Sequence, residues 1–236
     1  MIDKKESLLY EIGKTTGTDK ASASHTCNGM SYLHIYDFYL KPLVDDKINF
    51  LEIGVKNGQS HRMWSKYFHR DSKIYGLDID PRCKSLEKDN IKIFIGSQTD
   101  PGILDSILDD CGGVLDAIID DGSHVNDMTI FSFEHLFKTL KPGGIYIIED
   151  LGCSYLEQSL QSHLPHWIGM QYNEEFKKLE NPREKMNHFF NNLIKDLDVG
   201  EDYDPSLLYH VKHSPKIEWV HFYSKIVIIK KATEIN

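Results

Sequence analysis

The sequence predicts an α/β fold in which helices cover both faces of a mostly parallel sheet. Three observations support this class. Short apolar runs alternate with helical patterns between residues 47 and 151, which is typical of parallel strands buried on both faces. Two further apolar runs near the C-terminus follow each other almost directly and predict an antiparallel hairpin at the sheet edge. The chain has 236 residues, enough for one large domain with a sizeable core.

Residues 1–45 are expected to form an N-terminal cap of helices and a loop. "ESLLYEIGKT" (6–15) has apolar residues at helical spacing, whereas the small, polar "GTDKASASHTCNG" (17–29) is typical of a loop. "SYLHIYDFYLKPLV" (31–44) predicts a second, aromatic-rich helix. We expect Pro42 to end it, because proline cannot continue a helix interior.

Residues 46–151 are expected to form the core of the sheet. The predicted strands are 48–55, 73–80, 91–97, 115–122 and 144–151, and the predicted helices are 60–68, 101–108 and 127–140. "KPGG" (141–144) matches a helix-stop signal and is expected to close the last helix.

The rest of the chain contains an insertion and the terminal hairpin. Residues 152–215 carry prolines, histidines and aromatic residues, with predicted helices at 154–164 and 183–197. This stretch is too long for an ordinary connection, so we expect an inserted cap that binds an acceptor molecule. Residues 216–236 contain the hairpin, with strands at 216–224 and 225–231. We expect a single domain throughout.

Composition excludes several classes of protein. The net charge of −9 and the pI near 5.7 argue against a general nucleic-acid binder, which would present a basic face. No stretch is apolar over the roughly 18–20 residues that a spanning helix needs, and the N-terminus lacks the apolar segment of a secretory signal. The four cysteines show no CxxC pairing, which predicts reduced thiols in a cytoplasmic protein.

A glycine turn follows the first core strand in "FLEIGVKNGQS" (50–60). Gly54 and Gly58 allow a tight turn and a close backbone approach to a ligand, although a βα turn without a ligand would look similar. The spacing differs from the GxGxxG of dinucleotide folds. Glu52, just before the turn, would repel a pyrophosphate and suits a ligand with a cationic end.

The next two strand tips extend this interpretation. Asp78 ends the second strand, where an acid can accept hydrogen bonds from both ribose hydroxyls, and Gln98 follows the third, within reach of an adenine edge. A nucleoside with a cationic amino-acid tail fits all three tips. We therefore expect S-adenosylmethionine as the cofactor.

At this point the chain resembles the class I methyltransferases, whose Rossmann-like seven-stranded sheet matches the predicted strand plan. More narrowly, it resembles the metal-dependent sugar O-methyltransferases of macrolide and polysaccharide pathways. The matching pieces are "GTDK", "LEIGVKNGQS", "GLDID", "IDDGSH", "LKPGGIYIIEDL", "SY" and "HFYSKIVIIKK". Cephalosporin hydroxylase-like proteins share parts of this set. The family usually has Thr before "SY", where this chain has "EDLGCSY", and residues 157–212 show no similarity to the family.

Acidic residues at two neighbouring strand tips predict a metal site. Asp120, Asp121 and His124 follow the fourth strand, and Glu149 and Asp150 follow the fifth. Neighbouring strands lie about 4.8 Å apart, so these carboxylates can converge, and they repel one another unless a cation lies between them. Oxygen ligands favour Mg²⁺, or Mn²⁺ in its place. An alternative is that this segment only caps the next helix.

The resemblance implies roles for these residues. It places a metal on Asp121, Glu149 and Asp150 and makes His124 the base that deprotonates a hydroxyl, with Asp121 also part of the catalytic group. Either Glu149 or Asp150 could be the closer ligand, and Asp120 could orient a backbone instead of contacting the cofactor. The expected cofactor-binding residues are Thr18, Lys20, Glu52, Gly54, Val55, Gly58, Ser60, Asp78, Ile79, Gln98 and Asp120. For Thr18 and Lys20, in "GTDK", a solvated loop is the alternative to contact with the cofactor's carboxylate.

Other residues are given less specific roles. Tyr32 and Tyr36 lie one helical turn apart and are expected to pack in the core rather than flank the site. His163 and His166 lack a carboxylate partner at ligand spacing and are not expected to bind a metal.

The expected function is methyl transfer to a hydroxyl of a sugar or glycan precursor, of natural-product, capsule or lipopolysaccharide type. Two alternatives stay open: an oxygen of a phosphate or phosphoramidate group as acceptor, and a hydroxylase-like enzyme that binds iron. An iron triad needs two histidines, and only His124 lies at the predicted site. We expect no nucleic-acid partner, no membrane insertion, and a possible homodimer or higher homo-oligomer, because the N-terminal helix and the insertion offer apolar surface.

Overall fold

The computed structural model describes residues 7–155, 183–198 and 217–233. The predicted helix at 154–164 and the histidines at 163 and 166 lie almost entirely outside these residues. None of the described helices is long and apolar enough to cross a membrane. All four cysteines are buried and none forms a disulfide.

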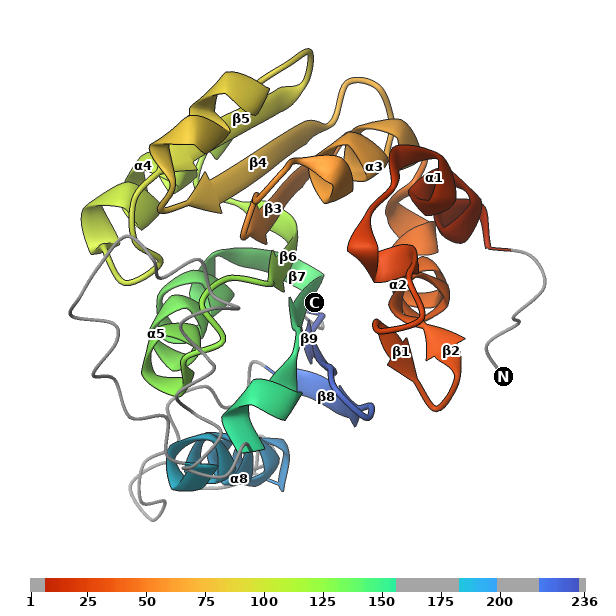
Figure 1. The fold of residues 1–236 in the computed structure, drawn as a ribbon. Coiled ribbons are helices and arrows are strands. Elements are labelled where there is room, and N and C mark those ends of the chain that lie inside the picture. Colours follow the sequence, from red (N-terminus) through yellow and green to blue (C-terminus); the bar gives the residue numbers. More distant parts are fainter. Residues whose placement is uncertain (1–6, 156–182, 199–216, 234–236) are drawn as a thin grey trace.

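A seven-stranded sheet forms the centre of the fold, in the order β5-β4-β3-β6-β7-β9-β8 (Figure 1). The strands are β3 (Asn49–Ile53), β4 (Lys73–Asp78), β5 (Ile91–Ile95), β6 (Leu115–Asp120), β7 (Leu140–Ile148), β8 (Ile217–Phe222) and β9 (Val227–Lys231). The first five are parallel, β9 pairs antiparallel with β7, and β8 pairs antiparallel with β9. The predicted mostly parallel sheet with a terminal hairpin is confirmed.

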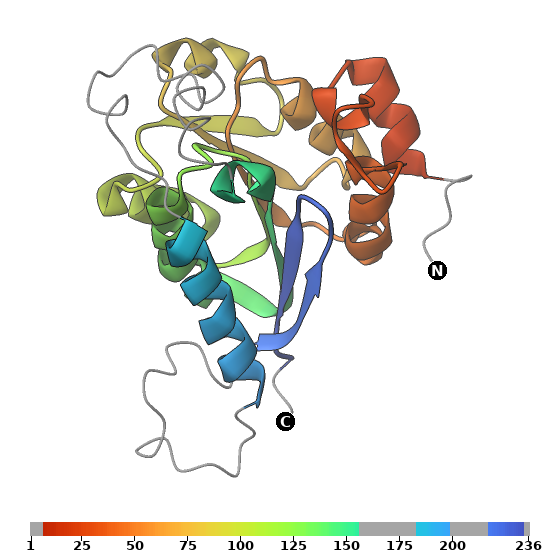
Figure 2. The same ribbon diagram turned by 60° about the horizontal axis from the view of Figure 1, so that its bottom comes forward.

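Helices cover both faces of this sheet (Figures 1 and 2). The helices are α1 (Leu8–Thr16), α2 (Tyr32–Leu40), α3 (Gln59–Tyr67), α4 (Pro101–Cys111), α5 (Asn126–Leu136) and α8 (Arg183–Asp198). Short 3₁₀ turns are η1 (Asp19–Ala21), η2 (Lys41–Leu43), η3 (Pro81–Leu86), η4 (Phe137–Thr139) and η5 (Leu151–Tyr155), and β1 (Thr26–Cys27) pairs with β2 (Met30–Ser31).

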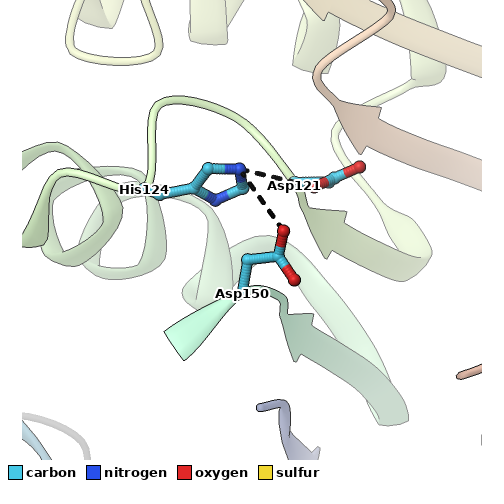
Figure 3. A group of neighbouring side chains, drawn as sticks. All are labelled: Asp121, His124 and Asp150. Atoms are coloured by element: carbon cyan, nitrogen blue, oxygen red, sulfur yellow. Dashed lines mark ion pairs between the residues drawn. The ribbon is translucent and has the colours of Figure 1, made fainter. Parts of the chain in front are cut away.

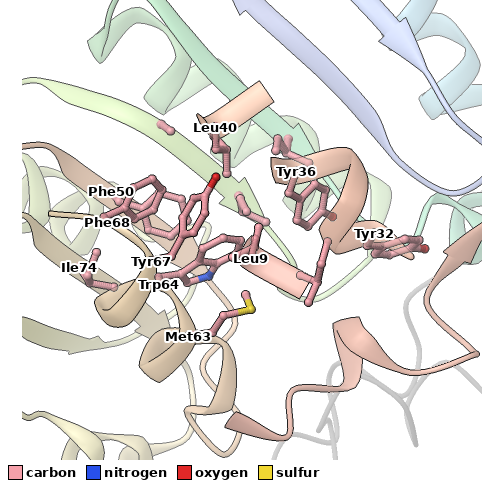
Figure 4. Packing of buried hydrophobic residues seen from close by; sticks show 14 of the residues in the cluster. Leu9, Tyr32, Tyr36, Leu40, Phe50, Met63, Trp64, Tyr67, Phe68 and Ile74 are labelled. Atoms are coloured by element: carbon pink, nitrogen blue, oxygen red, sulfur yellow. The ribbon is translucent and has the colours of Figure 1, made fainter. Parts of the chain in front are cut away.

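Alternation along the buried strands produces two hydrophobic cores. On β3, Phe50 packs with the core under α1, α2 and α3, and Leu51 packs with the core under α4, α5 and α8. The first core is rich in aromatic residues, and the ring centroids of Phe50 and Trp64 lie 5.0 Å apart (Figure 4). Side chains of one strand point alternately to opposite faces, so both faces must be apolar here.

Three details differ from the sequence prediction. "KPGG" does not close a helix: α5 ends at Leu136, η4 follows, and these residues lie inside β7. Gly143 has a φ of 78°, and the pairing of β6 with β7 shifts register near Leu115, so the glycines serve an irregular strand start.

The predicted loop 17–29 contains η1, β1 and part of the β1–β2 turn. The helix predicted at 31–44 is shorter, because α2 ends at Leu40. Pro42 lies in the 3₁₀ turn η2 that follows directly.

The predicted helix at 183–197 is confirmed as α8, which lies beside α5 and β8 (Figure 2). Its buried residues Met186, Phe189, Phe190 and Leu193 join the second core, and the ring centroids of Phe189 and Phe133 lie 5.1 Å apart. This face of the helix therefore packs inside the chain.

Candidate active site at the strand tips

Sheet pairing continues past the ends of three neighbouring strands and brings their acidic tips together. Ile53 of β3 pairs with Asp120 of β6. The amide of Asp121 donates to the carbonyl of Ile53 at 3.0 Å, and the amide of Glu149 donates to the carbonyl of Asp120 at 2.9 Å. The carboxyl ends of these strands thus form one edge, which we call the acidic rim and define as Glu52, Asp121, Glu149 and Asp150.

An imidazole and two carboxylates form an accessible group on this rim (Figure 3). Nε2 of His124 lies 3.7 Å from Oδ1 of Asp121 and 3.9 Å from Oδ2 of Asp150. The exposed fractions of the three side chains are 12%, 25% and 29%, so each is reachable from solvent. The predicted convergence of the fourth and fifth strand tips is present, and His124 faces both carboxylates.

The backbone at this group adopts an uncommon conformation. His124 has a φ of 56° and Asp150 a φ of 51°. Left-handed backbone is uncommon for residues other than glycine, and such conformations cluster at functional sites. Here they occur in two of the three residues that face each other, where they aim the side chains toward one point.

A second, buried group shares Asp121 with the first. Nζ of Lys20 lies 2.5 Å from Oδ2 of Asp121, 2.8 Å from both carboxylate oxygens of Glu149 and 3.5 Å from Oε1 of Glu52. Lys20 is 1% exposed, and both glutamates are fully buried. The sequence predicted that Lys20 contacts a cofactor carboxylate; in the structure its partners are carboxylates of the chain itself.

Burial dominates the electrostatics of the two glutamates. It raises the pKa of Glu52 to about 7, although the nearby Lys20 charge acts in the opposite direction. Burial, and then the charge of Asp121, raises the pKa of Glu149 well above its usual value. These shifts arise because a carboxylate in a low-dielectric interior is stabilised only by a cation close by.

Two groups of carboxylate and imidazole atoms among the described residues could hold a metal ion. One comprises Asp121, His124 and Asp150, and the other comprises Glu52, Asp121 and Glu149. The predicted ligands Asp121, Glu149 and Asp150 are therefore divided between the two groups, with Asp121 common to both. Only the first group is open to solvent on all its members.

The glycine turn after β3 is held against the rim. Gly54 has a φ of 95°, and a side chain there would place Cβ 2.1 Å from the carbonyl oxygen of Asp121. Oδ2 of Asp78 accepts hydrogen bonds from the amides of Val55 at 2.8 Å and Lys56 at 2.9 Å. Asp78 was predicted to bind a ribose; in the structure it fixes the turn.

Gln98 and Asp120 have structural partners. The side-chain amide of Gln98 donates to Asp120 at 3.2 Å and its carbonyl accepts from the amide of Ser123 at 2.8 Å. Asp120 also accepts from the hydroxyl of Ser132 at 2.6 Å and from the amide of Gly122 at 3.2 Å. Both side chains are buried, so they order the loop that carries His124. This matches the alternative role considered for Asp120, whereas Gln98 was expected to face adenine.

The remaining predicted residues lie around the same edge. Ser60 is buried in the first turn of α3, and its hydroxyl donates to Glu52 at 2.6 Å. Thr18 is buried and caps η1, and Gly58, with a φ of 70°, precedes α3. Ile79 is 43% exposed just past β4, which leaves an apolar side chain open at the strand tip.

Known proteins share this architecture. The methyltransferase MycE of the mycinamycin pathway, solved with Mg, SAH and mycinamycin VI, has a TM-score of 0.70 and 26% identity, over 98% of this chain and 56% of its own. The chain has the fold of a class I methyltransferase. An O-methyltransferase from Bacillus cereus solved with SAH shares the fold at 15% identity, with a TM-score of 0.52 over 97% of this chain and 92% of its own.

Curated relatives give the same family resemblance. Demethylmacrocin O-methyltransferase of Streptomyces fradiae is 39% identical over 127 residues, 51% of this chain and 31% of the relative. Mycinamicin VI 2''-O-methyltransferase of Micromonospora griseorubida is 38% identical over 127 residues, with the same coverage of 51% and 31%. The matched segment thus spans about a third of these relatives. No family model matches the chain.

One residue of this methyltransferase fold was not assigned to the site from the sequence. Tyr32 begins α2, is fully buried as predicted, and donates a hydrogen bond from its hydroxyl to Asp150 at 3.0 Å. Burial, and then the charge of Asp150, raises the pKa of this hydroxyl. A tyrosine in an aromatic stripe gives no sign of a polar partner more than a hundred residues away.

Proposed function

We propose that the chain is an S-adenosylmethionine-dependent, Mg²⁺-assisted O-methyltransferase that acts on a sugar hydroxyl. The observation that carries the proposal is the meeting of His124 with Asp121 and Asp150 at the strand tips, beside the Gly54 turn. The similarity to sugar O-methyltransferases, and the presence of Mg and SAH in MycE, support the same activity.

The residues present fit an S-adenosylmethionine site. Gly54 lets the turn after β3 pack directly against the backbone of Asp121 at the edge of the rim, and Ile79 offers apolar surface at the next strand tip. Glu52 itself is fully buried, and the accessible carboxylates of Asp121 and Asp150 make the rim acidic, which favours the cationic end of such a cofactor over a pyrophosphate. The cofactor supplies a methyl group on a sulfonium, and the chain has to position the accepting oxygen.

The residues present also fit a divalent cation. Asp121 and Asp150 present carboxylate oxygens to solvent, the ligand type that Mg²⁺ prefers, and Glu149 lies beside them. A bound Mg²⁺ would lower the pKa of an acceptor hydroxyl. His124 would accept the proton of that hydroxyl at Nε2, the ring nitrogen that faces both aspartates.

The iron alternative is not favoured. An iron triad needs two histidines and one carboxylate, whereas the accessible group among the described residues contains one histidine and two carboxylates. We therefore propose no redox role for the site.

A methyl-transfer assay tests the proposed function. The protein is incubated with methyl-labelled S-adenosylmethionine, Mg²⁺ and separate panels of nucleotide sugars, free glycosides and phosphorylated glycan precursors. We expect label on an oxygen of at least one sugar, with SAH released in equal amount. Label found only on phosphate-type oxygens would replace the sugar hydroxyl as acceptor. No binding of S-adenosylmethionine in calorimetry would refute the proposal.

A further inference from the structure

The turn before η1 directs one lysine into the interior. Gly17, with a φ of 71°, ends α1, and the Thr18 hydroxyl accepts the amide of Lys20 at 3.4 Å. The hydroxyl of Ser31 donates to the carbonyl of Lys20 at 2.9 Å. The neighbouring Asp19 stays at the surface and pairs with Lys56 at 2.9 Å. Both ends of the lysine backbone are thus fixed, and its side chain is 1% exposed.

The ammonium of this lysine contacts the tips of three neighbouring strands. It reaches Glu52 at the end of β3, Asp121 after β6 and Glu149 after β7. Glu149 is bound through both oxygens, whereas Asp121 uses Oδ2 for Lys20 and keeps Oδ1 toward His124. One cation therefore lies among three carboxylates, two of which are inaccessible to solvent.

The charges of the three carboxylates and of the ammonium offset one another in this arrangement. Carboxylates held close together in a low-dielectric interior repel strongly, and each buried charge is costly without a partner. The ammonium offsets part of this repulsion without any bound ion. The ammonium also repels a second cation that binds at the accessible group. The two sites are adjacent because Asp121 belongs to both groups and already contacts Lys20.

We propose that Lys20 is a built-in counterion of the acidic rim, which holds Glu52, Asp121 and Glu149 in place without a metal and limits how tightly the rim binds a divalent cation. This inference rests on the proposed function, since it concerns the cation that assists methyl transfer. Lys20 acts through the carboxylates and is a positioning residue.

Substitutions that remove or keep the charge test the proposal on the full chain. K20M removes the ammonium and keeps most of the apolar stem, and K20R keeps a positive charge. K56M removes the exposed lysine that pairs with Asp19 and serves as the matched control. The double variant K20M/E149Q removes one charge of each sign from the same buried pair. Each protein is purified in Mg²⁺ and then exchanged into EDTA or Mg²⁺.

Two readouts are independent of methyl transfer. Thermal unfolding is measured with and without Mg²⁺, and Mn²⁺ affinity is measured by electron paramagnetic resonance. For K20M we expect Mg²⁺ to raise the unfolding midpoint by about 5 °C or more, and the Mn²⁺ dissociation constant to fall about tenfold or more. Wild type, K20R and K56M should show small Mg²⁺ effects, with K20M/E149Q in between.

Other outcomes would overturn the proposal. Equal destabilisation of K20M with and without Mg²⁺, together with unchanged Mn²⁺ affinity, would reduce Lys20 to packing. If K20M does not fold, recovery of folding in K20M/E149Q supports the counterion role, and failure of both variants rejects it. A wild-type protein that binds Mn²⁺ but transfers no methyl group would refute the proposed function while leaving the test of Lys20 intact.

Discussion

The hydroxyl of Tyr32 donates a 3.0 Å hydrogen bond to Oδ1 of Asp150, a residue 118 positions further along the chain. The other oxygen of the same carboxylate lies 3.9 Å from Nε2 of His124. The first turn of α2 thus orients a carboxylate at the tip of β7, and the N-terminal segment is part of the site rather than only a cover over it.

Removing this hydroxyl is expected to weaken both metal binding and folding. In Y32F we expect the Mn²⁺ dissociation constant to rise about tenfold, because Asp150 loses the group that orients it. The free energy of unfolding should fall by about 1.5–3 kcal/mol, as for one hydrogen bond to a charged group. Y39F is the control, since the Tyr39 hydroxyl bonds Tyr223 at 2.7 Å and touches no rim carboxylate among the described contacts. Equal Mn²⁺ affinity in wild type and Y32F would contradict this role.

Replacing the proposed base is expected to separate binding from turnover. H124A should leave S-adenosylmethionine affinity nearly unchanged and lower turnover by about 10²-fold or more. Because His124 has a φ of 56°, H124N is the better matched variant, since asparagine tolerates left-handed backbone. Calorimetry and the methyl-transfer assay measure the two effects. Loss of cofactor affinity in H124N would count against the base role.

Metal removal is expected to stop the reaction reversibly. EDTA should abolish methyl transfer and excess Mg²⁺ should restore it, because Lys20, the cation within the rim, is only 1% exposed and so cannot contact an acceptor oxygen in place of the metal. In D150N the half-maximal Mg²⁺ concentration should rise about tenfold or more. Asparagine again suits the φ of 51°, and D127N on the exposed end of α5 is the control. Full activity in chelator would remove the metal from the reaction.

A glycine substitution tests the contact between the turn and the rim. G54A should destabilise the protein by about 3 kcal/mol or more, since its Cβ would lie 2.1 Å from the carbonyl oxygen of Asp121. G113A has a similar positive φ of 84° with no atom within 4 Å, so it isolates the backbone cost of about 1 kcal/mol. Denaturant unfolding compares the two. Similar losses in both variants would show that the close approach is unimportant.

Buried His61 predicts a pH dependence of stability. Burial, and then the charge of Lys20, lowers the pKa of His61 to about 4, below the 6.5 of an unfolded chain. Its stabilising contribution is complete above pH 6.5 and is lost as the pH falls toward 4, by up to about 3 kcal/mol. Oε2 of Glu52 lies 3.1 Å from Nδ1 of His61, and burial raises the pKa of Glu52 to about 7. Glu52 has the opposite effect on the pH dependence, since its contribution to stability is present at low pH and is lost as the pH rises through 7.

The comparison of wild type with H61Q isolates the contribution of the imidazole, because the neighbouring residues Glu52, Lys20 and Asp78 are present in both proteins. Urea unfolding between pH 4.5 and 7.5 should show wild type losing stability relative to H61Q as the pH falls. A constant difference across this range would mean that His61 does not titrate in the way its burial implies.

Local pattern was enough to predict the sheet and its order of elements. Each strand from β3 to β7 is a short apolar run between turn residues, and burial on both faces leaves such runs little choice of structure. "KPGG" misled because the helix-stop signal and an irregular strand start use the same residues. Only pairing with β6 and β9, which is not local, distinguishes the two.

The sequence by itself determined that Asp121, His124, Glu149 and Asp150 follow neighbouring strands, because parallel strands end at one edge. Tertiary structure alone decided which of them share a cation. Lys20 contacts Glu149 from 129 positions away, whereas Asp150 contacts His124 and Tyr32. Side-chain contacts of this range depend on how the N-terminal segment packs over the sheet. No spacing along the chain encodes that packing.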